Sequence, residues 1–405
     1  MSVDGSGGRS SGPLSPHAAG FRAFLDRQGY CSQQTGLQLG LMTQLSRWLA
    51  GQEIGAEDFT GQVVDQFAGV MRATRRSLIS QRALAPLLTY LRELAVVPAG
   101  PPADHTPHGI VVGSYRDYLR GGRGLAEGTV SGHLRFARAF LAELDDPLDE
   151  SLAALSAGQV LAIVARQVRE RRSVSSAKNL ASSVRTLLRF LFGRGYVGAD
   201  LAPVVLRVAP WRLTSAPGRL ETGAAQALLA SCDRSARKGL RDYAILLILA
   251  RLGLRASEAA TLTLDDIDWA AGEITIRGKG HRLGKLPLVW DCGEAIADYL
   301  HAGRPTCASR AVFITIHAPL GALSSQAVGQ VVAYACARAG LAPFGPHRLR
   351  HTLASDLLAA GAPLSEIGQV LRHQDPITTA HYARTDRAAL TALIRPWPSH
   401  QEETL

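Results

Sequence analysis

The sequence predicts a mainly α-helical protein with a small antiparallel β-sheet, in which helical N-terminal domains precede one α+β domain. At 405 residues the chain is too long for one compact core, and two segments rich in Pro and Gly divide it into three blocks. The first two blocks show only the periodicity of amphipathic helices. The third block combines helices with three short strand-like runs, which is typical of an α+β domain.

Shifts in composition set the expected domain boundaries. Residues 1–19 are rich in Gly and Ser and are expected to form a disordered tail. Two helical domains are expected at 20–98 and 108–203, separated by a segment rich in Pro. The α+β domain is expected at 216–395, followed by a short tail at 396–405.

The first two blocks resemble each other. Their last helices align at a constant offset of 100 residues, so that Leu91 and Val97 correspond to Leu191 and Val197. Two copies of a small helical unit would produce this pattern, and so would any two amphipathic helical hairpins. Both interpretations stay open at the level of the sequence.

The third block is expected to begin with a buried helix over 242–252, which Gly253 ends. A meander of three short strands follows at 266–269, 273–277 and 285–289. Ser324 or Ser325 then caps a helix that runs to about residue 340. The remaining helices are expected at 347–360, 365–372 and 377–383.

The charge of the chain points to a polyanionic partner. Its formal net charge is +10 and its sequence pI is about 9.7, which is typical of a protein that binds nucleic acid. Only four of the 44 basic residues are Lys, so the Arg-rich usage of a GC-rich genome is an alternative source of part of this charge.

Cysteine usage and apolar runs point to the cytoplasm. The five Cys residues are far apart and form no CxxC pair, which argues against a disulfide framework and against a zinc knuckle. The chain has no run of 18 apolar residues and no apolar signal core near its N-terminus. A cytoplasmic protein without a membrane partner is therefore expected.

Six residues from four segments form the candidate catalytic set. The segments are GLRASE, RGKG, PHRLRH and VLRHQDPITTAHY, and the residues are Arg255, Lys279, His347, Arg350, His373 and Tyr382. Five of them can carry positive charge or donate hydrogen bonds, and the sixth is a phenol nine residues after the last His. Such a set can grip a phosphodiester and attack it with Tyr, without a metal or another cofactor.

Position and residue type suggest individual roles. His347 and Arg350 project from one face of the first turn of a helix, and a helix N-terminus favours phosphate. Arg255 follows a buried helix and can bind phosphate oxygens bidentately. Lys279 lies between two Gly in a β-turn, and a Lys can release a proton, as a general acid must, whereas an Arg cannot.

Each of these residues alone also fits a structural role. His347 and Arg350 fit a solvated helix turn, and Arg255 fits a helix cap. Lys279 fits a solvated turn, and Tyr382 fits a core position on a short amphipathic helix. The order and spacing of the four segments favour one shared site over these separate roles.

From about residue 219 to residue 394, the order and spacing resemble the tyrosine recombinase/integrase family of the phage integrase type. This resemblance implies a tyrosine recombinase catalytic domain at 216–395. Residues 108–203 resemble the helical, SAM-like core-binding domain that binds DNA in that family. Residues 20–98 lie where family members carry variable arm domains.

The first half of the resemblance rests on GLRASE and RGKG. Arg255 resembles the first family Arg, in GLRxSE, and Lys279 resembles the Lys of the β-hairpin. The hairpin usually continues as GKGxKxR. Here Arg282 stands in place of the second Lys and Gly284 in place of the Arg, with Lys285 next to it.

The second half rests on PHRLRH and on the segment that ends in Tyr. His347 and Arg350 match the His and the second Arg of HxLRH, and His373 matches the third-box His. Tyr382 matches the nucleophile nine residues later. Arg372 stands where the family commonly has Gly.

The resemblance implies a site-specific DNA recombinase or integrase that serves a mobile element or replicon. Tyr382 attacks a DNA phosphodiester and leaves a 3′-phosphotyrosyl link and a free 5′-hydroxyl, while Lys279 protonates the leaving oxygen. The implied partner is double-stranded DNA at a specific recombination site, bound by a homotetramer or by an assembly with related recombinases. Candidate phosphate contacts in the second block are Arg166, Arg169, Arg171, Arg172 and Arg185.

Three other functions compete with this one. A type IB topoisomerase uses the same chemistry to relax DNA, and a non-catalytic DNA-binding regulator could share the scaffold. The paired helical blocks favour a recombinase over a topoisomerase. The presence of all six candidate residues argues against a non-catalytic regulator. A metal-dependent nuclease fits poorly because His347 and His373 have no cluster of carboxylate ligands near them.

Overall fold

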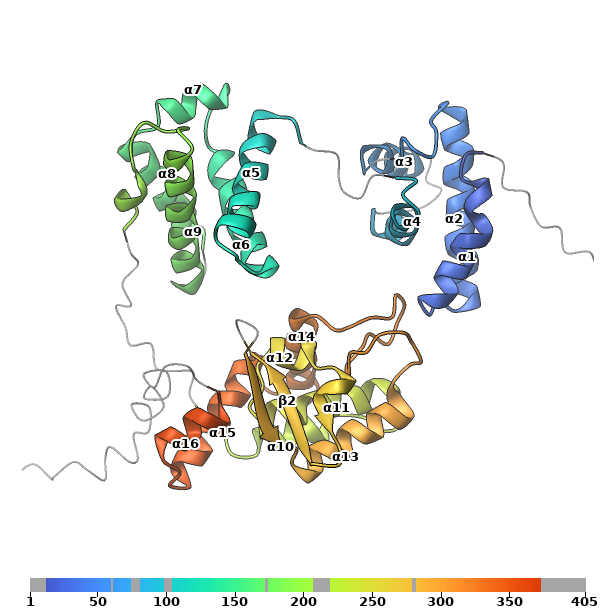
Figure 1. Ribbon diagram of the computed structural model, residues 1–405, viewed down its shortest axis with the longest axis vertical. Helices are drawn as coiled ribbons and strands as arrows, with labels where there is room; N and C mark the ends of the chain where they lie inside the picture. Colours follow the sequence, from blue (N-terminus) through green and yellow to red (C-terminus); the bar gives the residue numbers. More distant parts are fainter. Residues whose placement is uncertain are drawn as a thin grey trace, which may run out of the picture. The chain divides into compact units, whose positions relative to one another are not determined.

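The computed structural model describes residues 12–59, 61–73, 81–97, 104–171, 174–206, 219–278 and 282–372. Within these ranges the protein is built mainly from helices, together with one three-stranded antiparallel sheet (Figure 1). The predicted fold class is therefore confirmed. No helix in these ranges is long and apolar enough to cross a membrane.

The first two blocks are helical throughout their described parts. The first block contains α1 (Ala18–Arg27), α2 (Ser32–Gly51), α3 (Gly61–Ala73) and α4 (Gln81–Glu93). The second contains α5 (Pro107–Asp117), α6 (Glu127–Leu141), α7 (Leu148–Ala153), α8 (Ala157–Arg169) and α9 (Val174–Gly193). All five helices of the second block contribute apolar side chains to one hydrophobic core.

The last helices of the two blocks, α4 and α9, end in the same way. Shortly after each helix a residue with positive φ follows, Ala95 with 55° and Gly195 with 75°. The next backbone N–H then donates to the carbonyl of Leu91 or of Leu191, at 3.0 and 2.9 Å. Identical C-terminal turns at an offset of 100 residues support the hypothesis that the first block repeats the helical unit of the second.

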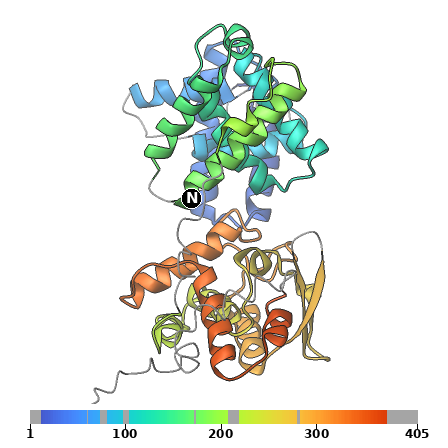
Figure 2. The same cartoon turned by 90° about the vertical axis from the view of Figure 1, so that its left-hand side faces the viewer.

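The third block combines helices with the sheet. Its helices are α10 (Ala224–Ala230), α11 (Arg237–Arg251), α12 (Ala256–Thr261), α13 (Trp290–Asp298), α14 (Ser325–Arg338), α15 (Pro346–Ala359) and α16 (Leu364–Val370). Its strands are β1 (Ile267–Asp268), β2 (Glu273–Arg277) and β3 (Leu283–Pro287), in the order β1-β2-β3. Figure 2 shows β2 and β3 as a hairpin at the edge of this block.

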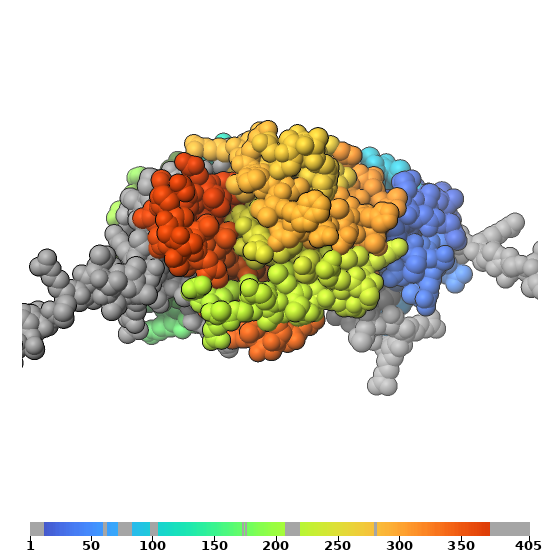
Figure 3. Space-filling model, turned by 90° about the horizontal axis from the view of Figure 1, so that it is seen from below, coloured from blue at the N-terminus to red at the C-terminus, as the bar shows by residue number. Residues whose placement is uncertain are grey.

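Helix α11 is the centre of the third block. Residues 244–249 of this helix are all buried, and it packs against α13, α14 and α15. On the face shown in Figure 3, α10 and α11 (yellow-green) lie beside the elements around α13 (yellow to orange) and beside α15 and α16 (red). This packing brings α15 and the turn after α11 together, although about a hundred residues separate them in the chain.

Most predicted elements of the third block are confirmed to within a few residues. Strand β2 spans the predicted residues, and Ser324 caps α14 by accepting a hydrogen bond from the Ala327 N–H at 3.1 Å. The predicted start of α11 was wrong by five residues. Residues 237–241 are mostly charged and lack the apolar pattern, but Arg241 among them forms a buried ion pair with Asp242 at 2.7 Å inside the helix. The helix predicted at 377–383 lies outside the described residues.

Candidate active site

The site begins at the tight turn after α11. Gly253 has φ of 57°, and a Cβ atom there would lie 2.9 Å from Leu371 Cδ2 and 3.0 Å from Leu353 Cδ2. Both the backbone conformation and the close approach of α15 and α16 therefore require Gly at this position. The turn delivers Arg255 to the N-cap position of α12.

Arg350, on α15, connects the turn after α11 to the end of α16 through hydrogen bonds. Its side chain is buried, with the residue only 3% exposed, and its Nη1 donates to the Gly253 carbonyl at 2.5 Å. Its Nη2 donates to the Leu371 carbonyl at the end of α16. A buried guanidinium needs such acceptors, and here they link the turn after α11 to the end of α16.

Glu258 is the buried carboxylate of the site. It accepts hydrogen bonds from the backbone N–H of Arg255 at 2.8 Å, from Arg255 Nη1 at 2.6 Å and from Arg372 Nη2 at 2.8 Å. Burial alone would raise the pKa of Glu258, but the Arg255 N–H and the two guanidiniums outweigh burial and lower this pKa. Glu258 is therefore ionised, and it is shared between two arginines.

His347 lies in the first turn of α15, near the guanidiniums of Arg350 and Arg255. It is partly surrounded by protein, and this desolvation, followed by the charges of Arg350 and Arg255, lowers its pKa below the usual 6.5. His347 is therefore neutral at pH 7 and can accept a proton. The pKa of the neighbouring His351 is also lowered, first by burial and then by His347 and Arg350.

The structure thus brings three of the six predicted residues, Arg255, His347 and Arg350, to one site. The other three, Lys279, His373 and Tyr382, lie outside the described residues. On either side of Lys279 the hairpin is closed, because the Gly278 N–H donates to the Arg282 carbonyl at 2.7 Å.

Comparison with known proteins places this site in a family. Residues 219–388 match the model of the "Phage integrase family", and residues 112–195 match "Phage integrase, N-terminal SAM-like domain". A protein of Sinorhizobium fredii strain NGR234, y4rA, named as a candidate integrase/recombinase, is 39% identical over 96% of both chains. The chain belongs to the phage integrase family of tyrosine recombinases. The match to residues 219–388 spans all six candidate residues.

Other family members match a large part of the chain. Tyrosine recombinase XerD of Mycobacterium tuberculosis strain H37Rv is 33% identical over 66% of this chain and 90% of its own. Among solved structures, XerH recombinase bound to a palindromic difH substrate covers 70% of this chain and 83% of its own, with a TM-score of 0.54 and 18% identity. A λ integrase(75–356) dimer bound to a COC′ core site covers 73% and 99%, with a TM-score of 0.51 and 17% identity. These two likenesses show a shared fold.

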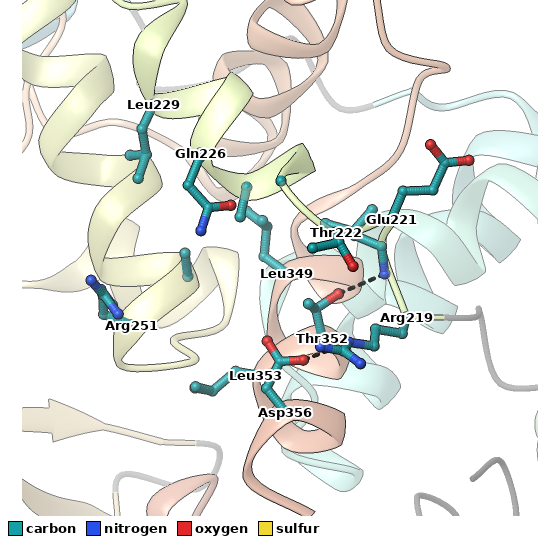
Figure 4. Close-up of a pocket in the computed structure, with 14 residues that line it drawn as sticks. Arg219, Glu221, Thr222, Gln226, Leu229, Arg251, Leu349, Thr352, Leu353 and Asp356 are labelled. Atoms are coloured by element: carbon teal, nitrogen blue, oxygen red, sulfur yellow. Dashed lines mark hydrogen bonds and ion pairs between the residues drawn. The ribbon is translucent and has the colours of Figure 1, made fainter. Parts of the chain in front are cut away.

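The recombinase has a pocket of about 310 Å³ that none of the three described candidate residues, Arg255, His347 and Arg350, lines. It lies between α10, the end of α11 and α15, and Figure 4 shows Leu349, Thr352 and Asp356 of α15 lining it. Arg219 pairs with Asp356 at 2.6 Å across its rim. Neither Arg255 nor His347 lines this pocket, so helix α15 presents its predicted catalytic residues elsewhere.

Two of the arginines that were expected to contact phosphate also have partners within the protein. Arg185 Nη1 donates to the Val205 carbonyl at 3.2 Å, and Arg166 pairs with Glu143. The Arg166 side chain is still 59% exposed, so its pairing with Glu143 leaves contact with phosphate a prediction. Arg172 lies outside the described residues.

The sequence favours Glu258 as a local partner that orients the groups around Arg255, and it marks Arg372 as a departure from the family pattern that bears on DNA contacts or on the approach of His373. The one signal for Glu258 is its spacing, because a Glu three residues after an N-cap can bond back to the cap. No local pattern predicts that Arg372 reaches the same carboxylate from 114 residues away.

Proposed function

We propose that this recombinase cuts and rejoins duplex DNA at a specific site through a 3′-phosphotyrosyl intermediate on Tyr382. The observation that carries the proposal is the convergence of Arg255, His347 and Arg350 at the junction of α12, α15 and the turn after α11. The buried carboxylate there, Glu258, is engaged by two guanidiniums. The three guanidiniums of Arg255, Arg350 and Arg372 outnumber this one carboxylate, so these groups together favour an anion.

In the proposed reaction the Tyr382 hydroxyl oxygen attacks phosphorus while neutral His347 takes the phenolic proton. Arg255 and Arg350 stabilise the charge on the non-bridging oxygens, and His373 donates a hydrogen bond to them. The bond from phosphorus to the 5′-oxygen breaks, and Lys279 supplies the proton that turns this oxygen into a hydroxyl. Rejoining is the reverse step, with the 5′-hydroxyl of another strand as the nucleophile.

The domains and the assembly are part of the same proposal. Residues 20–98 serve as an arm-like domain, residues 108–203 as the core-binding domain and residues 216–395 as the catalytic domain. The named DNA complexes of XerH and λ integrase support duplex DNA as the partner. Four protomers on two DNA sites, alone or with related recombinases, would cut the four strands that exchange requires.

A trapping experiment on DNA of random sequence tests the proposed function, because it lets the protein select its own site. The full chain is incubated in excess chelator with a library of nicked random duplexes, and covalent protein–DNA adducts are recovered and sequenced. We expect adducts with protein on the 3′ end, a free 5′-hydroxyl, and one enriched sequence. Cleavage that requires a divalent cation and leaves no protein on the DNA would instead indicate a nuclease.

The lowered pKa of His347 predicts the pH dependence of the reaction. A base must be neutral, so the rate falls only when His347 is protonated, below its lowered pKa. The second-order rate constant at low DNA concentration, which reports the free protein, should stay level from pH 7 down past 6.5 and fall below that. The His347→Ala variant should be slower by about 10²- to 10⁴-fold and should lose this acid limb.

DNA affinity measured at each pH serves as the control, because it separates the base from a general effect on binding. An acid limb in the parent chain with its midpoint at or above pH 6.5 would contradict the assignment.

A further inference from the structure

Arg372, just after α16, has an unfavourable backbone conformation. Its φ is 54°, in the left-handed region that L side chains rarely adopt and that Gly adopts easily. An Arg at such a position has to recover this cost through contacts of its side chain.

The side chain of Arg372 crosses β3 at Gly284. A Cβ atom added to Gly284 would lie 3.1 Å from Arg372 Cδ and 3.6 Å from Cγ, so any larger residue there would push the Arg stem aside. Gly284 pairs with Ile276 within the regular β2–β3 ladder, so its role is to leave space and not to permit an unusual turn.

The guanidinium of Arg372 ends inside the candidate active site. Its side chain is 13% exposed, its Nη2 donates to Glu258 Oε2 at 2.8 Å, and its Nη1 donates to the Val370 carbonyl at 3.0 Å. The second oxygen of Glu258 accepts from Arg255 Nη1 at 2.6 Å. One buried carboxylate thus lies between two guanidiniums from different elements.

The charges of this trio lead to a role for Arg372. A carboxylate paired with Arg255 alone would form a neutral pair, and the attraction of Arg255 for a phosphate would be largely cancelled. With Arg372 on the other oxygen, the trio keeps one net positive charge, which one phosphodiester can neutralise.

We infer that Arg372 is a positioning residue for strand cleavage: by sharing Glu258 it keeps Arg255 oriented and leaves the trio with a net positive charge for the scissile phosphate, and Gly284 provides its space. The inference rests on the proposed function. It also gives one explanation for two departures from the family pattern. Gly284 stands where the hairpin usually has Arg, and Arg372 stands where Gly is common. In this chain the guanidinium that reaches Glu258 beside Arg255 comes from the end of α16.

Four variants of the full chain test the inference: Arg372→Gly, Arg372→Lys, Gly284→Ala and the double variant Arg372→Gly/Gly284→Ala. Each is measured for DNA affinity, for the rate of adduct formation at saturating DNA, and for its unfolding midpoint. The Gly variant suits the backbone at φ 54°, so its folding should be retained while the guanidinium is removed.

We expect Arg372→Gly to slow adduct formation by about 10- to 100-fold, the range observed when a partner that orients a metal-ligating side chain is lost. DNA affinity should change little, and Arg372→Lys should recover part of the rate because an ammonium can still pair with Glu258. Gly284→Ala should slow the parent chain but have no further effect in the Arg372→Gly background, because the stem that it displaces is gone.

Adduct formation by Arg372→Gly at the parent rate would overturn the inference, and additive effects of the two substitutions would overturn the part played by Gly284. These outcomes differ from failure of the proposed function, in which the parent chain itself forms no adduct on any DNA. That result would contradict both the proposed reaction and the role of Arg372 in it.

Discussion

Replacing Tyr382 with Phe should abolish covalent attachment of the recombinase to DNA while leaving DNA binding intact. The substitution removes one oxygen atom, and without it the proposed reaction has no nucleophile. Loss of a nucleophile costs at least about 10⁴-fold in other enzymes, so no adduct should be detectable on nicked duplexes. The measurement is denaturing electrophoresis of the trapped DNA, with affinity determined in parallel.

Tyr334→Phe provides a matched control for this experiment. Tyr334 lies on α14 with 56% of its surface exposed, so loss of its hydroxyl should change neither affinity nor adduct formation. Adducts formed by the Tyr382→Phe variant at the parent rate would show that another residue attacks the phosphate.

Replacing Lys279 with Ala should slow cleavage by about 10²- to 10⁴-fold, the usual contribution of a general acid. The defect should disappear on a substrate whose 5′-bridging oxygen is replaced by sulfur. A thiol has a pKa of about 8.5, far below that of an alcohol, so a thiolate leaves without a proton. The rate of adduct formation on the two substrates, measured in single turnovers, gives the comparison.

Lys285→Ala is the control, because Lys285 lies in the same hairpin but pairs with Glu273 at 2.7 Å on the surface. This variant should cleave both substrates at the parent rates, since exposed pairs contribute little. If sulfur substitution left the Lys279→Ala defect unchanged, Lys279 would act on the phosphate and not on the leaving group.

Periodic and capped elements were predictable because their signals are local. The alternation in Glu273 to Arg277 predicts β2, and Ser324 predicts the start of α14. The start of α11 was not predictable in this way. Its first turns contain a charged pair, Arg241 and Asp242, that is buried only because the surrounding fold supplies an acceptor at the Ile314 carbonyl.

In the candidate site, too, residues with local signals were predictable and contacts between distant segments were not. Arg255, His347 and Arg350 could be named from residue type and spacing, and the structure brings them together. The contacts of Arg372 could not be predicted, because they join α12, β3 and the end of α16 over long separations in the chain. Likewise, a basic composition could not predict that Arg185 donates to the backbone carbonyl of Val205.

The most direct test of the proposed reaction is to identify the residue attached to DNA. The adduct formed by the parent chain in excess chelator is digested with protease and nuclease, and the nucleotide-bearing peptide is sequenced by mass spectrometry. We expect one modified peptide, with a 3′-phosphate esterified to the Tyr382 hydroxyl. A nucleotide on any other residue, or DNA cut without attached peptide, would contradict the proposed reaction.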